Sequence, residues 1–156
     1  MAFTEIKGKV VTINQASHIL YSVFSDLRNF TAALPQDKKE GIIATENTLE
    51  GKVKGFDLGI KIANKVPFTI ISFEPYGKVP FNFAFSVFFD VLDIQKTNFH
   101  IELAADLNYM LKMMIGSKLQ DMVDQMTEQI AGAFNGNLPN NVDFQDFLKS
   151  NGSNFN

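Results

Sequence analysis

The chain contains no cysteine, so it can form neither a disulfide framework nor a thiolate metal site. It also lacks tryptophan and any apolar run of about 18 residues, the length that a membrane-spanning helix needs. Its first ten residues carry charges and show no apolar stretch of the kind found in signal peptides. Together these absences predict a cytoplasmic protein without a transmembrane segment.

Clustered positive charge is missing as well. The net charge is −3, and the lysines are scattered among carboxylates. Binding to a nucleic-acid backbone needs clustered cations, so we expect no nucleic-acid partner. Lys52, Lys54, Lys61 and Lys65 alternate on two neighbouring predicted strands. We interpret them as partners in cross-strand ion pairs on the outer face; docking to an acidic partner or to a membrane surface is the alternative.

Motifs for phosphate binding and nucleophilic catalysis are absent too. The sequence has no Walker-type loop, no Gly-x-Gly-x-x-Gly and no Gly-x-Ser-x-Gly. His100 and Glu102 share one face of a predicted strand, but a zinc site needs three or four ligands and the chain has only two histidines. We therefore expect no metal and no cofactor, and we interpret this pair as part of a solvated face.

The apolar pattern predicts one strand, two short helices, six strands and one long helix. Residues 3–13 form the first strand, Ser17 is the expected N-cap of the first helix, and Asp26 caps a second short turn that Pro35 ends. Between residues 39 and 107 the period is two, as in an antiparallel sheet with one wet face. Residues 109–134 then show helical periodicity with a single apolar side, where Gly116 either permits close packing or marks a bend.

These elements predict one α+β domain over residues 1–134, followed by an Asn-rich tail over residues 135–156. A twisted sheet of seven strands curls, and the long helix must bury its apolar side against the inner face of that sheet. In the tail, residues 143–149 have the pattern of one or two helical turns, and about the last seven residues have a composition typical of disorder.

The layout resembles the helix-grip fold of the START-like superfamily, also called SRPBCC, which includes birch-pollen allergen, START lipid-transfer domains and polyketide cyclases. The resemblance extends over roughly residues 3–134 and rests on two segments. These are residues 13–35 (with Ile13-Asn14-Gln15-Ala16-Ser17, Val23-Phe24-Ser25-Asp26-Leu27-Arg28-Asn29-Phe30 and Leu34-Pro35) and residues 105–120 (with Ala105-Asp106-Leu107-Asn108, Leu111-Lys112-Met113-Met114 and Lys118-Leu119-Gln120). The second segment is similar to small single-domain members typical of Bacteroidetes-type bacteria. The resemblance implies a hydrophobic cavity between helix and sheet, and no particular ligand.

Sixteen phenylalanines and six methionines supply adaptable apolar side chains for such a cavity. The function that we expect is binding or transport of a small hydrophobic ligand, a lipid or a polycyclic metabolite. The residues expected to line the cavity are Phe24, Leu49, Phe56, Leu58, Ile60, Ile71, Phe73, Phe83, Phe85, Phe89, Ile101, Leu103, Leu111, Met114, Ile115, Met122 and Met126.

Two other functions stay open at this point. A polyketide cyclase or dehydratase would act in the same cavity, but no ionisable residue falls on the expected inner positions, and no catalytic residue is assigned. The nearest polar candidates are Tyr21, Arg28, Asn82 and Tyr109. An interaction protein, as in co-chaperone relatives of the superfamily, would bind a protein partner through the tail, where Phe144 and Phe147 lie.

Overall fold

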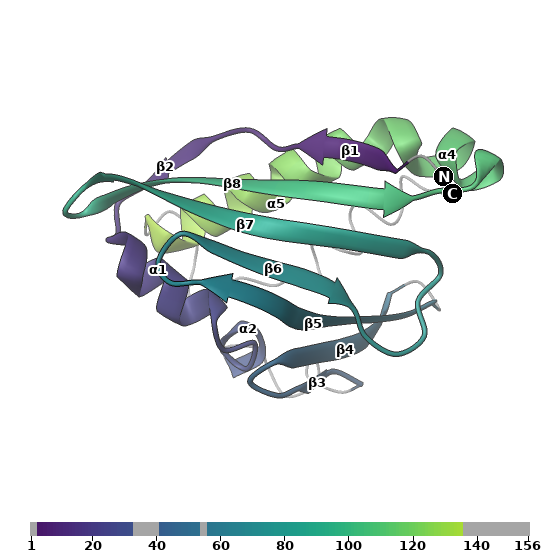
Figure 1. The fold of residues 1–156 in the computed structure, drawn as a ribbon, viewed down its shortest axis with the longest axis horizontal. Coiled ribbons are helices and arrows are strands. Elements are labelled where there is room, and N and C mark those ends of the chain that lie inside the picture. The colour runs from purple at the N-terminus through teal and green to yellow at the C-terminus, as the bar shows by residue number, and fades with distance from the viewer. Residues whose placement is uncertain (1–2, 33–40, 54–55, 136–156) are drawn as a thin grey trace.

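An antiparallel sheet is the framework of the chain in the computed structural model, which describes residues 3–32, 41–53 and 56–135 (Figure 1). Within these residues the sheet has eight strands in the order β1-β8-β7-β6-β5-β4-β3, and β2 also pairs with β8. The strands are β1 Thr4–Lys7, β2 Val11–Ile13, β3 Ile43–Ala44, β4 Thr48–Val53, β5 Phe56–Val66, β6 Ile70–Pro75, β7 Asn82–Asp93 and β8 Lys96–Asp106.

The central hairpin of β7 and β8 confirms the alternation predicted from the sequence. Phe83 lies opposite Ala105, and Phe89 lies opposite Phe99. These four side chains point inward and are buried, whereas Ala84, between the inward positions Phe83 and Phe85, is exposed. Because successive side chains of a strand point to opposite faces, this pattern fixes which face of the whole sheet is apolar.

The predicted first strand is split in two, which gives eight strands instead of seven. Between β1 and β2 the chain bends at Gly8, whose N–H donates to the Ile101 carbonyl at 2.8 Å, while the N–H of Lys9 donates to Asp124 Oδ1 at 2.8 Å. A Cβ at Gly8 would lie 2.7 Å from Val123 Cγ1. Glycine is therefore needed where this edge of the sheet meets the C-terminal helix.

The two short predicted helices are α1 Ser17–Phe24 and α2 Asn29–Ala32. The prediction that Ser17 is the N-cap was wrong: Ala16 occupies that position and makes no side-chain capping bond. The carboxylate of Asp26 does bind the backbone before α2, because its Oδ1 accepts the N–H of Arg28 at 3.0 Å. Pro35 and residues 136–156, including the tail's predicted helical turns, lie outside the described residues.

The long C-terminal helix is interrupted at the position where the sequence has Gly116. It consists of α4 Tyr109–Ile115, a 3-10 segment η1 Gly116–Lys118 and α5 Leu119–Phe134. Asn108 caps the N-terminus of α4 by accepting the N–H of Leu111 at 2.9 Å. Of the two interpretations of Gly116, the structure favours the one in which it marks an irregularity in the helix.

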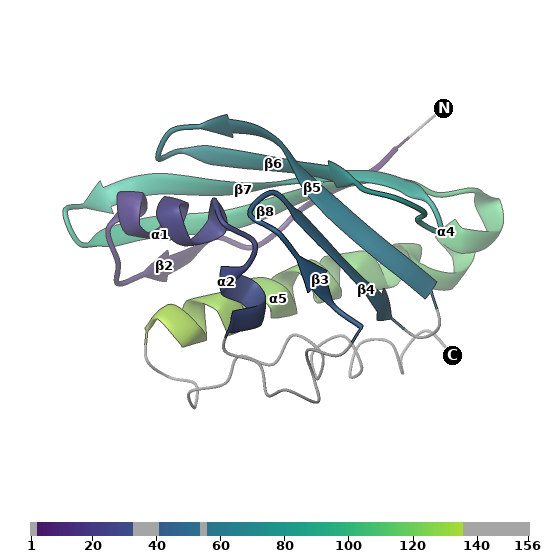
Figure 2. The ribbon, with the colours of Figure 1, turned by 90° about the horizontal axis from the view of Figure 1, so that it is seen from below.

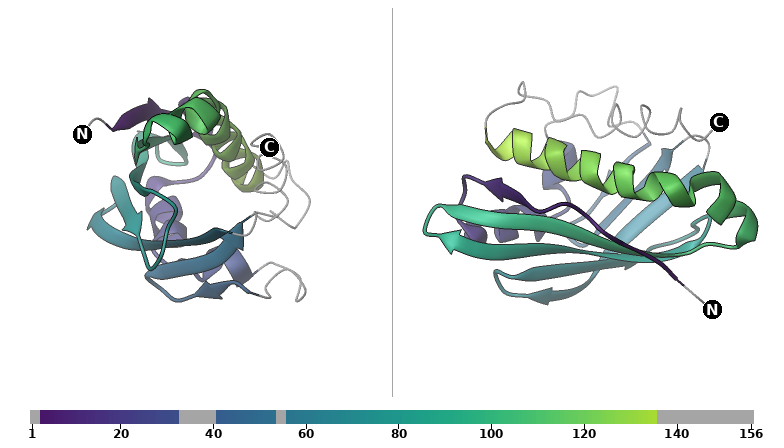
Figure 3. Two further views of the ribbon diagram at one scale, coloured as in Figure 1. Left: turned by 90° about the vertical axis from the view of Figure 1, so that its right-hand side faces the viewer. Right: turned by 90° about the horizontal axis from the view of Figure 1, so that it is seen from above.

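Helix α5 crosses the inner face of the curled sheet and packs against β1, β2 and β8, while α1 covers β6 and β7 near one end (Figures 2 and 3). This is an α+β arrangement in which the sheet grips the C-terminal helix, as predicted. Among the described residues, no helix is long and apolar enough to cross a membrane.

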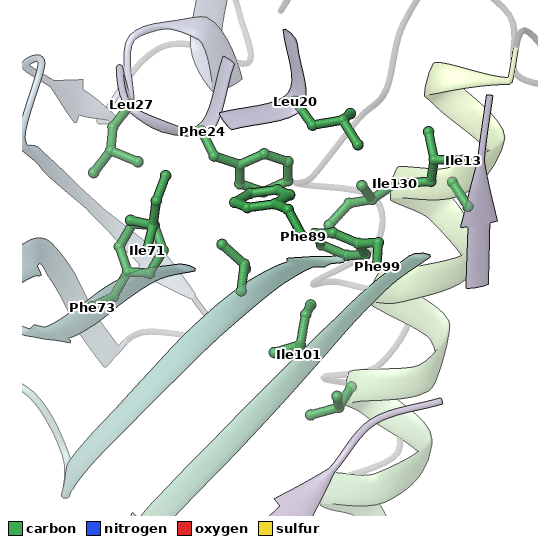
Figure 4. Packing of buried hydrophobic residues seen from close by; sticks show 13 residues of the cluster. Ile13, Leu20, Phe24, Leu27, Ile71, Phe73, Phe89, Phe99, Ile101 and Ile130 are labelled. Carbon is green, nitrogen blue, oxygen red and sulfur yellow. The ribbon is translucent and has the colours of Figure 1, made fainter. Parts of the chain in front are cut away.

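The core between these layers is rich in aromatic rings. Phe24 of α1 contacts Phe89 and Phe99, each with ring centroids 5.6 Å apart, and Ile130 reaches the same cluster from α5 (Figure 4). Phe89 and Phe99 have no solvent-exposed surface. Burial of one such side chain contributes about 1.5–3 kcal/mol, so this cluster is the main apolar link between α1, α5 and the sheet.

Candidate functional site

The buried core divides into two clusters. The first contains Phe24, Phe89 and Ile101 and lies beside α1 and the C-terminal half of α5. The second contains Phe83, Ala105 and Leu119 and lies near the junction of η1 and α5. Within the inner face, the two clusters are separate groups of fully buried side chains.

Between the two clusters lies a band of apolar side chains that are only partly buried. Ile6, Ile60, Phe85 and Leu103 contact both clusters, and we call these four residues the central band. Burial changes sharply along the inner face of β8. Ile101 is 3% exposed and Ala105 is 0% exposed, while Leu103 between them is partly accessible to solvent. The accessible part of this strand's inner face therefore lies at the level of the central band.

The register places three residues of the central band in one row. Phe85 of β7 lies directly opposite Leu103 of β8, which in turn lies opposite Ile6 of β1. Ile60 lies outside this row, on β5, where it is opposite Leu49 of β4, which is also partly buried. Because α5 packs against β1, β2 and β8, the inner face of β4 and β5 receives less cover from this helix.

The structure distributes sixteen of the seventeen predicted cavity residues over three environments. Phe24, Ile71, Phe73, Phe83, Phe89 and Ile101 are buried. Leu49, Leu58, Ile60, Phe85, Leu103, Leu111, Ile115, Met122 and Met126 are partly buried and pack against one or both clusters. Met114 is 51% exposed, because α4 turns it away from the sheet. The side chain of Phe56 lies outside the described residues.

Several core side chains were not among the predicted cavity residues, for example Ile62, Val87, Phe99, Thr127 and Phe134. Ile62, Val87 and Phe99 follow the period-two pattern of their strands, so the alternation itself predicts them on the inner face. Thr127 is fully buried because its hydroxyl donates to the Val123 carbonyl at 2.8 Å within α5, and no pattern of apolar residues reveals such a position.

One charged side chain lies on the inner face of the described strands, near one end of the sheet. A β-bulge between Ile62 and Asn64 shifts the register, so that Lys65 lies opposite the buried Ile71. The interpretation of Lys65 as an outer-face residue was therefore wrong, whereas Lys61 does form the predicted outer ion pair, with its Nζ 3.2 Å from Glu74 Oε1. The described inner-face positions of β4 to β8 carry no Asp, Glu or His.

The carboxylate of Asp26, in the connection between α1 and α2, lies within the electrostatic influence of Lys65. Arg28 donates to this carboxylate from its side chain, at 2.9 Å from Nε and 2.6 Å from Nη2. These hydrogen bonds are the main reason that the pKa of Asp26 lies below its usual value, and the charge of Lys65 lowers the pKa further. Asp26 is therefore ionised at neutral pH and belongs to a surface ion pair.

Of the polar candidates named from the sequence, only Tyr21 lies against the buried clusters. Its ring meets Phe68 edge-on with centroids 5.4 Å apart, and it contacts Phe89 at 6.4 Å. Arg28 and Asn82 are exposed, and Tyr109 is 82% exposed. The structure brings none of these three to the inner face.

His100 corrects the prediction of a solvated outer face. It is 7% exposed, because the ring of Phe88 directly across the strands stacks on the imidazole with centroids 4.5 Å apart. Its Nε2 lies 2.8 Å from Glu102 Oε2, and its buried Nδ1 has no hydrogen-bond partner. Within the described part of the chain, no three His, Asp or Glu side chains gather as a metal site would require.

No family profile and no curated protein sequence matches the chain. Solved structures do match. A START superfamily protein from Mycobacterium smegmatis has a TM-score of 0.59 at 12% identity, with 85% of this chain and 97% of that chain covered. The Aha1 dimer from Colwellia psychrerythraea gives a TM-score of 0.60 at 11% identity, covering 86% of this chain and 98% of that one.

An enzyme also appears among the matches. Norcoclaurine synthase from Thalictrum flavum, solved in complex with dopamine and hydroxybenzaldehyde, has a TM-score of 0.57 at 7% identity, with 76% of this chain and 78% of that chain covered. At such low identities the likeness speaks for the fold alone. The described chain, with its eight-stranded antiparallel sheet closed around α5, has the helix-grip fold of the START-like proteins.

Proposed function

We propose that the protein binds and carries a small hydrophobic ligand, which lies along the central band between α5 and the inner face of the sheet. The observation that supports this proposal is the division of the core into two buried clusters with partly accessible apolar residues between them. When an apolar molecule covers accessible apolar side chains inside a fold, both surfaces leave water and the free energy of the system falls.

The chemistry of the band favours an apolar ligand. The four residues of the central band are Ile, Leu and Phe, and on α5 Met126 and Met122 are partly buried against the first and the second cluster. Methionine adapts its shape, so the site can accommodate ligands of different outline. Of the described sheet residues that face inward, Lys65 alone is charged, and it lies at the far end near Asp26. An acyl chain or a ring system fits these surroundings better than a polar metabolite.

The expected affinity follows from the area covered. An acyl chain of about ten methylenes gains about 8 kcal/mol when it leaves water. The loss of translational and rotational freedom opposes this gain. A dissociation constant in the micromolar range, which corresponds to about 8 kcal/mol, is therefore the tightest binding that we expect without a polar anchor.

Two experiments test the proposal. Native mass spectrometry of protein purified from the organism that produces it should show a bound apolar molecule. In addition, a fluorescent fatty acid such as cis-parinaric acid should bind at one site per chain, and Leu103→Phe should weaken this binding at least tenfold by filling the central band. Ile94→Phe is the matched control, because Ile94 is 88% exposed at the β7–β8 turn. A protein that is free of ligand in the first experiment and takes up no fatty acid in the second would refute the proposal.

A further inference from the structure

Helix α4 has an apolar side that faces away from the protein. Tyr109, Met110, Met113 and Met114 are 82%, 70%, 69% and 51% exposed, and we call them the α4 patch. At 3.6 residues per turn these four side chains occupy one continuous arc of about 140° around the helix. Large apolar residues exposed together in this way are typical of an interaction surface, in contrast to single exposed apolar residues.

The other side of α4 anchors the helix to the core. Leu111 and Ile115, four residues apart and hence on one face, pack against the second buried cluster. Asn108 caps the helix, so its position is fixed from both its N-terminus and its inner face. Figure 3 shows α4 at the end of the molecule beyond the C-terminal end of β8. The patch is therefore held outward by the fold and does not result from a loosely placed helix.

The charged residues of α4 and η1 have one sign. These two segments contain two lysines and no Asp or Glu, although Asp106 and Asp121 lie on either side of them and the whole chain has a net charge of −3. Lys112 is exposed, flanks the arc of the patch, and makes no ion pair with any described residue. Tyrosine is enriched at lipid–water interfaces, and helices that lie in such an interface carry lysine or arginine beside an exposed apolar face.

The opposite end of β8 provides a contrast. There the β7–β8 turn exposes Leu92 and Ile94, and the flanking charges of Asp90, Asp93 and Lys96 sum to a net negative charge. An anionic surface would repel this end and attract the end that carries α4. A symmetric dimer through the α4 patch is disfavoured because it would bring Lys112 of one copy close to Lys112 of the other.

We infer that the α4 patch docks the protein on a membrane surface that contains anionic lipids. Tyr109, Met110 and Met113 would enter the interface, and Lys112 would bind the lipid headgroups. The inference builds on the proposed function, because a carrier of hydrophobic ligands must exchange its cargo with a lipid phase. The surface itself can be tested without any ligand in the central band.

The test is co-sedimentation of the full chain with vesicles of phosphatidylcholine, with and without phosphatidylserine. We expect binding to the anionic vesicles that weakens as salt increases. The double variant Met110→Ser/Met113→Ser should weaken binding at least tenfold, and Lys112→Glu by about fivefold or more. The matched control Leu92→Ser/Ile94→Ser, with equally exposed apolar residues at the other end of β8, should bind as the wild type does.

Three results would overturn the inference: no vesicle binding by the wild type, equal loss in the α4 and control variants, or a dimer in solution that Met110→Ser/Met113→Ser dissociates. Fatty-acid uptake in vesicle-free buffer separates the two proposals. The α4 double variant should keep the wild-type affinity for cis-parinaric acid. If the wild type binds vesicles but takes up no fatty acid, the carrier function is refuted and the docking surface is supported. If it takes up fatty acid but binds no vesicles, the docking surface is refuted and the carrier function is supported.

Discussion

Two substitutions to a larger residue in β8 test whether the interior is filled at the level of the central band. Ile101 and Leu103 point to the same face of one strand, two residues apart, but Ile101 is 3% exposed and Leu103 is partly accessible. Replacing either residue with Phe adds a similar volume. At Ile101 the larger ring meets Val87, 2% exposed, directly across the sheet. Enlargement in such a packed place costs about 1–3 kcal/mol.

At Leu103 the ring can extend into the incompletely packed central band, so we expect the free energy of unfolding to change by less than about 1 kcal/mol. Urea unfolding followed by far-UV circular dichroism measures both effects, because the chain has no tryptophan to report by fluorescence. With a slope of about 1–3 kcal/mol/M, Ile101→Phe should lower the midpoint by about 1 M, and Leu103→Phe should leave it almost unchanged. Equal destabilisation by the two variants would show that the central band is already filled and would refute the reasoning.

Three further predictions concern the scaffold. Gly8→Ala should lower the free energy of unfolding by about 1–3 kcal/mol, because the new Cβ would lie only 2.7 Å from an α5 side chain. Gly116→Ala should raise the free energy of unfolding by up to about 1 kcal/mol, because its Cβ would meet only the flexible side chain of Lys112. Chemical denaturation of both variants measures these changes. Phe68 has φ of +65°, so Phe68→Gly should be more stable than Phe68→Ala by about 1 kcal/mol in the same assay, and equal stability would argue against backbone strain at this turn. Because the pKa of Asp26 is lowered on folding, its ionised carboxylate stabilises the native state at neutral pH, and this contribution disappears as the pH falls through the folded pKa. The difference in unfolding free energy between wild type and Asp26→Asn should therefore be constant near neutrality and shrink below about pH 4. A difference that is independent of pH down to pH 2 would contradict the assignment.

Period-two alternation was enough to predict the antiparallel sheet and most of its inner face. The rule is reliable here because one face is buried, so a slip of one residue would expose Phe83 or Phe89. It failed where the backbone departs from a regular strand. The bulge after Ile62 moved Lys65 to the inner face, and the bend at Gly8 divided the first strand. Neither event leaves a mark in the sequence that alternation alone can detect.

Two other differences arise from contacts between distant residues. His100 is buried because Phe88 of the neighbouring strand stacks on it, and the sequence does not show which residues lie opposite each other in a sheet. The interruption at Gly116 was anticipated as one of two interpretations, but the exposure of Met114 was not, because the heptad-like spacing continues through α4. Of the central band, Ile60, Phe85 and Leu103 were among the predicted cavity residues, but the sequence could not show which inner-face positions stay accessible, since this depends on the distance between α5 and the sheet.

The account depends most directly on where an apolar ligand contacts the protein. The six methionines provide the probes, because Met122 and Met126 of α5 pack against the two clusters that border the central band, while Met110 and Met113 are exposed on α4. In methyl spectra of protein labelled at methionine, titration with monomeric decanoate in vesicle-free buffer should shift the signals of Met122 and Met126 with saturation at one ligand per chain. The contradicting result would be that these two signals stay in place while only Met110 and Met113 respond, or that no methionine signal moves.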